Sequence, residues 1–117
     1  MAIQDVLTKQ LEFDRALLTQ LRAGGDNASV VHRVEHHFLA GERDPLVKLS
    51  EYARSLLFEP SDTSQHEHEA SRYWVVDLVS RIRLDDGRIS CETALMKFLA
   101  IGYRVDYDGW GTYLEKG

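Results

Sequence analysis

Apolar residues recur at helical spacing along the first part of the chain. They are three, four or seven positions apart, and the stripe consists of Ile3, Leu7, Leu11, Leu18 and Leu21, with Phe13 and Leu17 beside it. This spacing predicts an amphipathic helix. Gly24-Gly25 supplies the positive-φ freedom that favours a helix C-terminus. We therefore expect an N-terminal helix over residues 1–24 that needs a surface to cover.

Two later segments alternate their side chains with the period of two that is typical of β-strands. In residues 28–39 this alternation places His36 and His37 on opposite faces. In residues 72–84 both faces are apolar, which is typical of a central strand. The second apolar face needs a cover, which we expect from the N-terminal helix, a second copy of the chain or a partner.

Capping and turn residues divide the rest of the chain. Asp44-Pro45 combines an N-cap oxygen with a residue whose fixed φ suits the first helical position, so a helix is predicted to about Leu56. Ser90 is expected to cap a third helix that ends before Gly102. We also predict a short strand at 57–59, a loop or frayed hairpin tip at 60–71 and a last strand at 103–114.

The order of these elements predicts the fold class. After the first helix it is β-α-β-β-α-β, which with right-handed crossovers favours an α+β fold, a ferredoxin-like antiparallel sheet with helices on one side. The chain has 117 residues, which is within the range of one compact domain. We expect a single domain over residues 1–117, with the additional N-terminal helix at 1–24 and the ferredoxin-like α/β core at 28–114.

Composition and charge narrow the range of functions. The formal net charge of -5 opposes binding to a bare phosphate backbone, so we expect no direct nucleic-acid partner. The chain has no run of about 20 apolar residues and no apolar signal-peptide core at its start. A single cysteine, Cys91, excludes an intramolecular disulfide. These features predict a cytoplasmic protein without membrane contact.

Histidines and Cys91 are the candidates for metal binding or catalysis. His32 and His36 share a strand face and could meet a third ligand, but we expect them to be polar members of a half-buried strand. Residues 66–69 hold two more histidines without a fixed third and fourth ligand. Cys91 lies near a predicted helix N-terminus without a partner base, and we expect it to fill the core. No spacing typical of a hydrolase or a phosphate-binding loop occurs. We therefore predict no catalytic residues, no cofactor, no metal and no enzyme activity.

Residues 106–113 form the most unusual segment, Asp-Tyr-Asp-Gly-Trp-Gly-Thr-Tyr. Glycine within a strand often marks a bulge or a close backbone approach, and aromatic residues commonly cover a core. A structural role for this segment is therefore one interpretation. Exposure of part of it to a partner is compatible with that role.

The segment from Val105 to Tyr113 resembles the C-terminal signature sequence of the RraB family. The members of this family are protein regulators of ribonuclease E activity. Residues 34–37, Val-Glu-His-His, are similar to the hydrophobic-Glu-His-His segment of the same family. The resemblance spans nearly the whole chain. It implies a regulator that binds ribonuclease E, or a similar RNA-degrading assembly, and inhibits its cleavage by direct contact rather than by chemistry.

In a ferredoxin-like sheet the last strand usually lies beside the first, so we expect the two motifs to form one patch. The candidate partner-binding residues are Glu35, His37, Asp106, Asp108, Trp110 and Tyr113. The acidic balance of the chain would complement a basic region of the nuclease. Two alternatives remain, a homodimeric interaction or immunity-type module with another partner, and a metal-dependent enzyme, which the missing catalytic spacing disfavours.

Overall fold

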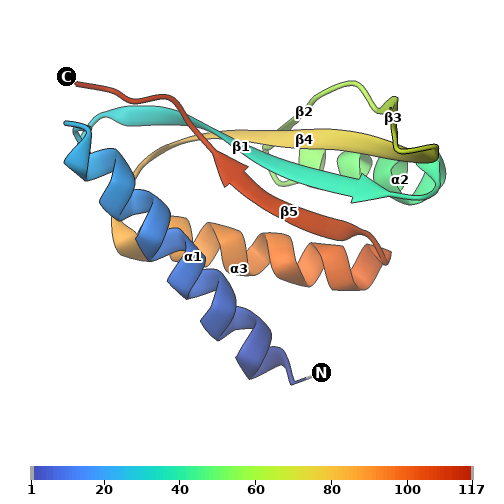
Figure 1. The fold of residues 1–117 in the computed structure, drawn as a ribbon, viewed down its shortest axis with the longest axis horizontal. Coiled ribbons are helices and arrows are strands. Elements are labelled where there is room, and N and C mark those ends of the chain that lie inside the picture. The colour runs from blue at the N-terminus through green and yellow to red at the C-terminus, as the bar shows by residue number, and fades with distance from the viewer. Residues whose placement is uncertain (1, 117) are drawn as a thin grey trace.

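Three helices pack on one face of a five-stranded antiparallel sheet in the computed structural model, which describes residues 2–116 (Figure 1). In chain order the elements are α1 (Ile3–Ala23), β1 (Val31–Ala40), α2 (Arg43–Ser55), β2 (Glu59–Pro60), β3 (Ser64–His68), β4 (Ser71–Arg83), α3 (Asp86–Tyr103) and β5 (Asp106–Gly111). The predicted fold class, an α+β ferredoxin-like sheet with an additional N-terminal helix, is confirmed.

The strand order places the two long strands at the centre of the sheet. It is β2-β4-β1-β5, and β3 also pairs with β4. Glu59 lies opposite Val79, whereas Ser64 lies opposite Val75, so that β2 and β3 follow one another along one edge of β4. Part of the segment predicted as a loop or frayed hairpin tip is therefore a strand. β1 pairs with β4 on one side and with β5 on the other.

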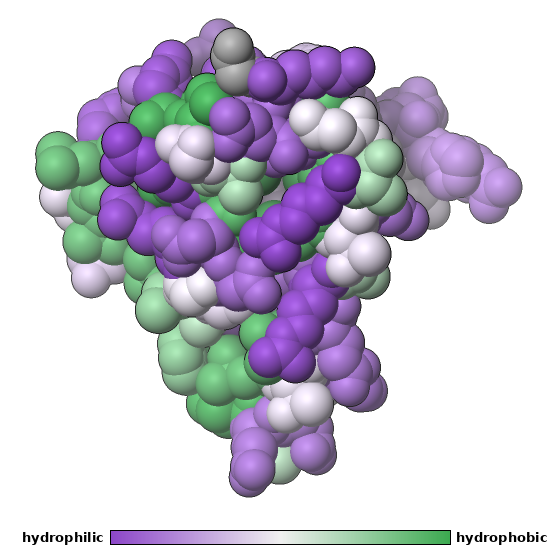
Figure 2. All heavy atoms as spheres, turned by 90° about the vertical axis from the view of Figure 1, so that its left-hand side faces the viewer, coloured by the Kyte–Doolittle hydropathy of each residue, from purple (hydrophilic) through white to green (hydrophobic). Residues whose placement is uncertain are grey.

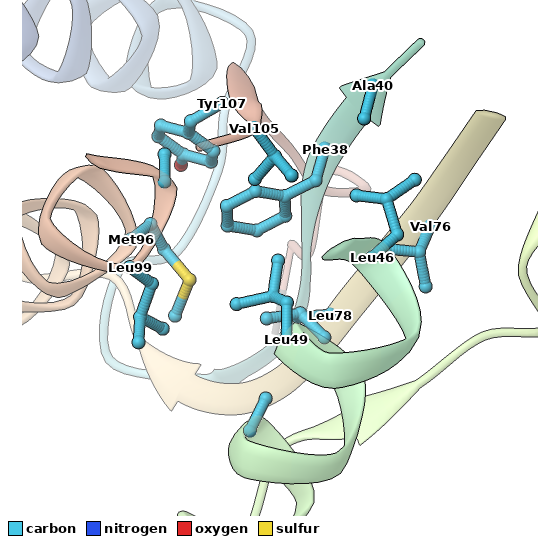
Figure 3. Close-up of a cluster of buried hydrophobic side chains, with 12 residues drawn as sticks. Phe38, Ala40, Leu46, Leu49, Val76, Leu78, Met96, Leu99, Val105 and Tyr107 are labelled. Carbon is cyan, nitrogen blue, oxygen red and sulfur yellow. The ribbon is translucent and has the colours of Figure 1, made fainter. Parts of the chain in front are cut away.

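The core lies between the sheet and the helices. Alternate side chains of β1 and β4 point toward α2 and α3, and side chains from these elements gather around Phe38, which is 1% exposed (Figure 3). This cluster includes Phe38, Leu46, Leu49, Val76, Leu78, Met96, Leu99, Val105 and Tyr107. A second cluster beneath α1 contains Leu18, Val34, Ile82, Leu84, Ile89 and Trp110.

The helix α1 covers the same side of the sheet as α3. Its buried residues are Gln10, Asp14 and Leu18, whereas Ile3 and Phe13 from the predicted apolar stripe are both 48% exposed. The N-terminal end of α1 projects below α3 and away from the sheet, which leaves Ile3 with little of the protein to pack against (Figure 1). This projecting part is hydrophobic on one side and hydrophilic on the other (Figure 2). The opposite face of the sheet thus has no helix on it within residues 2–116.

The helix α3 begins earlier than predicted. Asp85, not Ser90, is its N-cap, and the Asp85 carboxylate accepts a hydrogen bond from the backbone N–H of Arg88 at 2.7 Å. The helix is turned so that Thr93 faces inward and Cys91 is exposed. The expectation that Cys91 fills the core was therefore wrong.

Candidate functional site

The two sequence motifs lie side by side because β5 pairs with β1. Glu35 is opposite Gly111, and His36 is opposite Trp110. The register shifts between His36 and Phe38, which is a β-bulge or a similar irregularity. The expectation that the motifs are neighbours is confirmed.

The alternation of strand side chains divides the motifs between the two faces of the sheet. His36 and Trp110 point toward the helices and are 0% and 4% exposed. His37 lies on the opposite face, which no helix of residues 2–116 covers, and its side chain is 41% exposed. Adjacent motif residues therefore have different environments, one in the core and one in contact with solvent.

Beneath the sheet, Trp110 is fixed by a buried carboxylate. The Trp110 indole donates its Nε1–H to Asp14 Oδ1 at 2.9 Å, and Gln10 Nε2 donates to the same oxygen at 2.8 Å. The Thr93 hydroxyl donates to Asp14 Oδ2 at 2.5 Å. Asp14 is 1% exposed, so these three donors replace the water that a buried carboxylate loses. They also tie α1 to α3 and β5.

A second polar chain runs through His36. Its Nδ1 is 2.8 Å from the Tyr107 hydroxyl, and its Nε2 is 2.6 Å from Glu92 Oε1, which also accepts from the Ser80 hydroxyl. Burial, followed by the negative charges of Asp14 and Glu92, raises the pKa of the Tyr107 phenol. The phenol therefore stays protonated, and its hydroxyl can donate to His36 Nδ1 or accept from it, so that each of these side chains has a hydrogen-bond partner.

The loop after α1 is held by a third pair, His32 and Asp26. His32 Nε2 is 2.7 Å from Asp26 Oδ1, which also accepts the backbone N–H of Glu115 at 2.8 Å. Burial alone would raise the pKa of the Asp26 carboxyl. The hydrogen bonds from His32 and Glu115, with the charges of His32 and Arg22, hold that pKa below its ordinary value of 3.8. This carboxylate joins the C-terminal segment to β1.

The opposite face of the sheet contains a cavity of about 450 Å³, here called the open-face cavity. Its walls come from β1, β3, β4 and β5, and it is lined by His37, Phe38, Leu39, His66, His68, Tyr73, Val75, Asp77 and Asp108. His37 Nδ1 is 2.8 Å from Asp77 Oδ1, and the His66 ring stacks on Tyr73 with centroids 5.9 Å apart. Imidazoles and carboxylates thus surround an apolar floor.

The structure brings three of the predicted partner-binding residues to this cavity or beside it. His37 and Asp108 line the cavity. Asp106 is exposed and lies opposite Leu39, whose side chain lines the cavity, so that Asp106 is on the same face.

The other three predicted residues lie apart from the cavity. Glu35 is on the open face but nearer the start of β1, where its carboxylate pairs with Arg33 at 2.6 Å. Tyr113 follows β5 and is 70% exposed. Trp110 is buried on the helix-covered face.

The residues that β3 and β4 contribute to this cavity were not predicted from the sequence. His66 and His68 were expected in a loop, and Asp77 and Tyr73 were not singled out. One signal was present, because a carboxylate inside an otherwise apolar central strand is costly to bury and so marks an open face.

Two further observations concern metal sites and membrane-spanning helices. Among residues 2–116, no group of three or more His, Cys, Asp or Glu is arranged to hold a metal ion. Within the same residues, the helices are all too short or too polar to cross a membrane.

Within residues 2–116 the molecule is a small α+β protein with a ferredoxin-like sheet, one face of which is covered by helices and the other open. The chain belongs to the family described as regulator of ribonuclease activity B, RraB, which matches residues 11–112. The matched stretch includes residues 34–37 and all but the last residue of 105–113. The resemblance based on these two motifs is therefore confirmed.

Individual relatives carry the same name. The regulator of ribonuclease activity B from Colwellia psychrerythraea is 34% identical over 115 residues, which are 97% of this chain and 99% of that protein. The protein of that name from Xenorhabdus nematophila is 34% identical over 116 residues, 98% of this chain and 82% of its own length. The one from Escherichia coli K12 is 30% identical over 116 residues, with 98% and 84% covered.

Proposed function

We propose that this protein inhibits an RNA-degrading endonuclease of the ribonuclease E type by direct contact, without catalysing a reaction itself. The observation that carries this proposal is the family match over residues 11–112, since the family is described as regulating ribonuclease activity. We propose further that it acts in the cytoplasm and that residues 1–117 work as one domain.

The open face of the sheet supports contact as the mode of action. His37, Asp106 and Asp108 present polar groups to solvent beside an apolar floor, which is the composition of a protein-binding surface. Glu35 and Tyr113 extend this surface along β1 and the C-terminal segment. Trp110 serves the surface indirectly, because its bond to Asp14 holds β5 against the helices.

Charge favours the nuclease rather than the RNA as the partner. The formal net charge is -5, and nonspecific affinity for RNA requires clustered Lys and Arg. A protein of this charge repels RNA phosphates and attracts the basic regions with which a nuclease holds RNA.

Titration calorimetry of the full chain against full-length ribonuclease E, combined with an RNA cleavage assay, tests the proposal. We expect saturable binding and slower cleavage, and both effects should weaken with added salt because surface charges are screened beyond about 8 Å at 0.15 M. Light scattering of the free protein gives the mass of the titrated species, which separates a monomer from the homodimer of the alternative interpretation. Absence of binding at about 50 μM protein in low salt, with unchanged cleavage, would overturn the proposal.

A further inference from the structure

We propose that the open-face cavity receives an arginine side chain from a basic region of the protein partner. This inference rests on the proposed function for the identity of the partner, and it adds the side-chain chemistry that the cavity recognises. It is drawn from the charges, the floor and the surroundings of the cavity.

The charges of the cavity lining favour a cation. Asp77 of β4 and Asp108 of β5 both line the cavity, and β1 runs between these two strands. Asp77 accepts one hydrogen bond through Oδ1, from His37, and its side chain is 35% exposed. Within residues 2–116, no hydrogen bond or ion pair engages the Asp108 carboxylate, which is exposed. The residues that line the cavity include no lysine or arginine.

The floor of the cavity favours arginine over a compact cation. Leu39 and Val75 provide an aliphatic surface on which the methylene stem of a long side chain can lie. Tyr73, already stacked with His66 at an interplanar angle of 24°, provides an aromatic face for a flat guanidinium. A guanidinium also presents five N–H donors in a planar fork, whereas lysine has a single strongly hydrated ammonium. The volume of about 450 Å³ lies within the usual range of ligand pockets, about 300–1,000 Å³.

The surroundings of the cavity concentrate the negative charge at one end of the open face. Arg33 and Glu35, toward the start of β1, neutralise one another at 2.6 Å. Among the described residues, the carboxylates of Asp106 and Asp108 form no ion pair, although Lys9 and Lys97 line a second cavity that also includes Asp108. Carboxylates without an ion pair therefore lie where the apolar floor is, and this combination distinguishes the cavity from the rest of the face.

Metal binding is a weaker interpretation of the same lining. Three imidazoles and two carboxylates surround the cavity, but among residues 2–116 no three of these groups are placed to share one ion. A long cationic side chain needs no such convergence, because its donors are spread over the planar group.

The first experiment tests the cavity without the nuclease. Blocked peptides Ala-Arg-Ala, Ala-Lys-Ala and Ala-citrulline-Ala are titrated into the isotope-labelled full chain, and backbone amide shifts are followed by NMR. We expect the arginine peptide to shift the amides of His37, Val75 and Asp108 saturably, with a smaller effect of the lysine peptide and none of neutral citrulline. Equal shifts with all three peptides, or none at the cavity with any, would overturn the inference.

The second experiment uses the nuclease and separates this inference from the proposed function. Asp108→Asn and Asp77→Asn are expected to weaken binding to full-length ribonuclease E by about tenfold or more each, as for a close charge pair. The control Glu51→Gln removes an equal charge from exposed α2 surface and should change the affinity less than about twofold.

The outcomes of the two experiments differ. Unchanged affinity of both cavity variants, with normal binding of the unaltered chain, would reject the arginine site and leave the proposed function standing. Absence of any binding to the nuclease would reject the proposed function, and the peptide titration would then decide on the cavity alone.

Discussion

On the helix-covered face of the sheet His36 is 0% exposed, whereas on the open face the side chain of His37, the next residue, is 41% exposed. Trp110 and Asp108 on β5 also have different environments, since Trp110 is buried and Asp108 is exposed, although they are two residues apart. The register shift of β5 against β1 interrupts the simple alternation between them. The two motifs therefore contain one set of residues that stabilises the sheet and one that is exposed to solvent.

The polar groups of the covered face form hydrogen bonds within the protein, whereas those of the open face are in contact with solvent. Within residues 2–116, no buried side-chain nitrogen or oxygen atom lacks a hydrogen-bond partner. A buried group without a partner would lose its hydration and gain nothing, so Asp14 and His36 are both fully bonded. On the open face the Asp108 carboxylate is exposed, so it keeps access to solvent and needs no partner from the protein.

Trp110, on the covered face, should be the position most sensitive to substitution. Trp110→Ala should lower the free energy of unfolding by about 3–5 kcal/mol, because it leaves a cavity and removes one donor from Asp14. Trp110→Phe keeps most of the volume and removes only the donor, so its cost should be nearer about 1–3 kcal/mol. Urea unfolding followed by circular dichroism measures both. An unchanged midpoint for Trp110→Ala would show that the indole is not a core element.

The two glycines of β5 offer a matched comparison of backbone strain. Gly109 has a φ of +90°, and an added Cβ would lie 3.4 Å from Phe13 Cζ, so Gly109→Ala should cost about 1–2 kcal/mol. An added Cβ at Gly111 would meet His37 Nε2 at 3.7 Å, an ordinary contact, and Gly111→Ala should cost less than about 0.5 kcal/mol. Thermal unfolding distinguishes the two, and equal losses would contradict the strain at Gly109.

The Asp26 carboxylate predicts a pH dependence. The pKa of Asp26 is lowered in the folded state, so its ionised form stabilises the fold at pH values above the pKa of the unfolded state, about 3.9. This stabilisation is lost as the pH falls through the pKa of the folded state. Asp26→Asn should therefore lower the free energy of unfolding by about 1 kcal/mol at pH 7, and the difference should shrink below about pH 4. Urea unfolding over this pH range measures it, with exposed Asp62→Asn as the control. A difference that persists at low pH would exclude the ionised carboxylate as its source.

The smallest effect on stability is expected on the open face. His37→Gln removes a half-exposed pair with Asp77, and Asp108→Asn removes an exposed charge, so each should change the free energy of unfolding by about 0.5 kcal/mol or less. The same denaturation measurement applies, in parallel with the binding assays above. A loss of several kcal/mol would mean that the open face contributes to folding as the covered face does.

Features that depend on local geometry could be predicted from the order of the residues. The alternation along β1 is enough to assign His36 and His37 to opposite faces, and the order of elements is enough to place β5 beside β1. The start of α3 is five residues earlier than predicted, because Asp85 and Ser90 are both good N-cap residues and only packing decides between them.

Which face of the sheet stays open depends instead on contacts between distant parts of the chain. The apolar stripe of α1 gave no indication of whether it would cover the second face of the sheet or lie beside α3, and its polar residue Asp14 proved to be buried because Thr93 and Trp110 supply donors from distant parts of the chain. The open-face cavity likewise joins residues of four strands, which become neighbours only through the sheet register. Such contacts depend on long-range pairing, which hydrophobic periodicity does not encode.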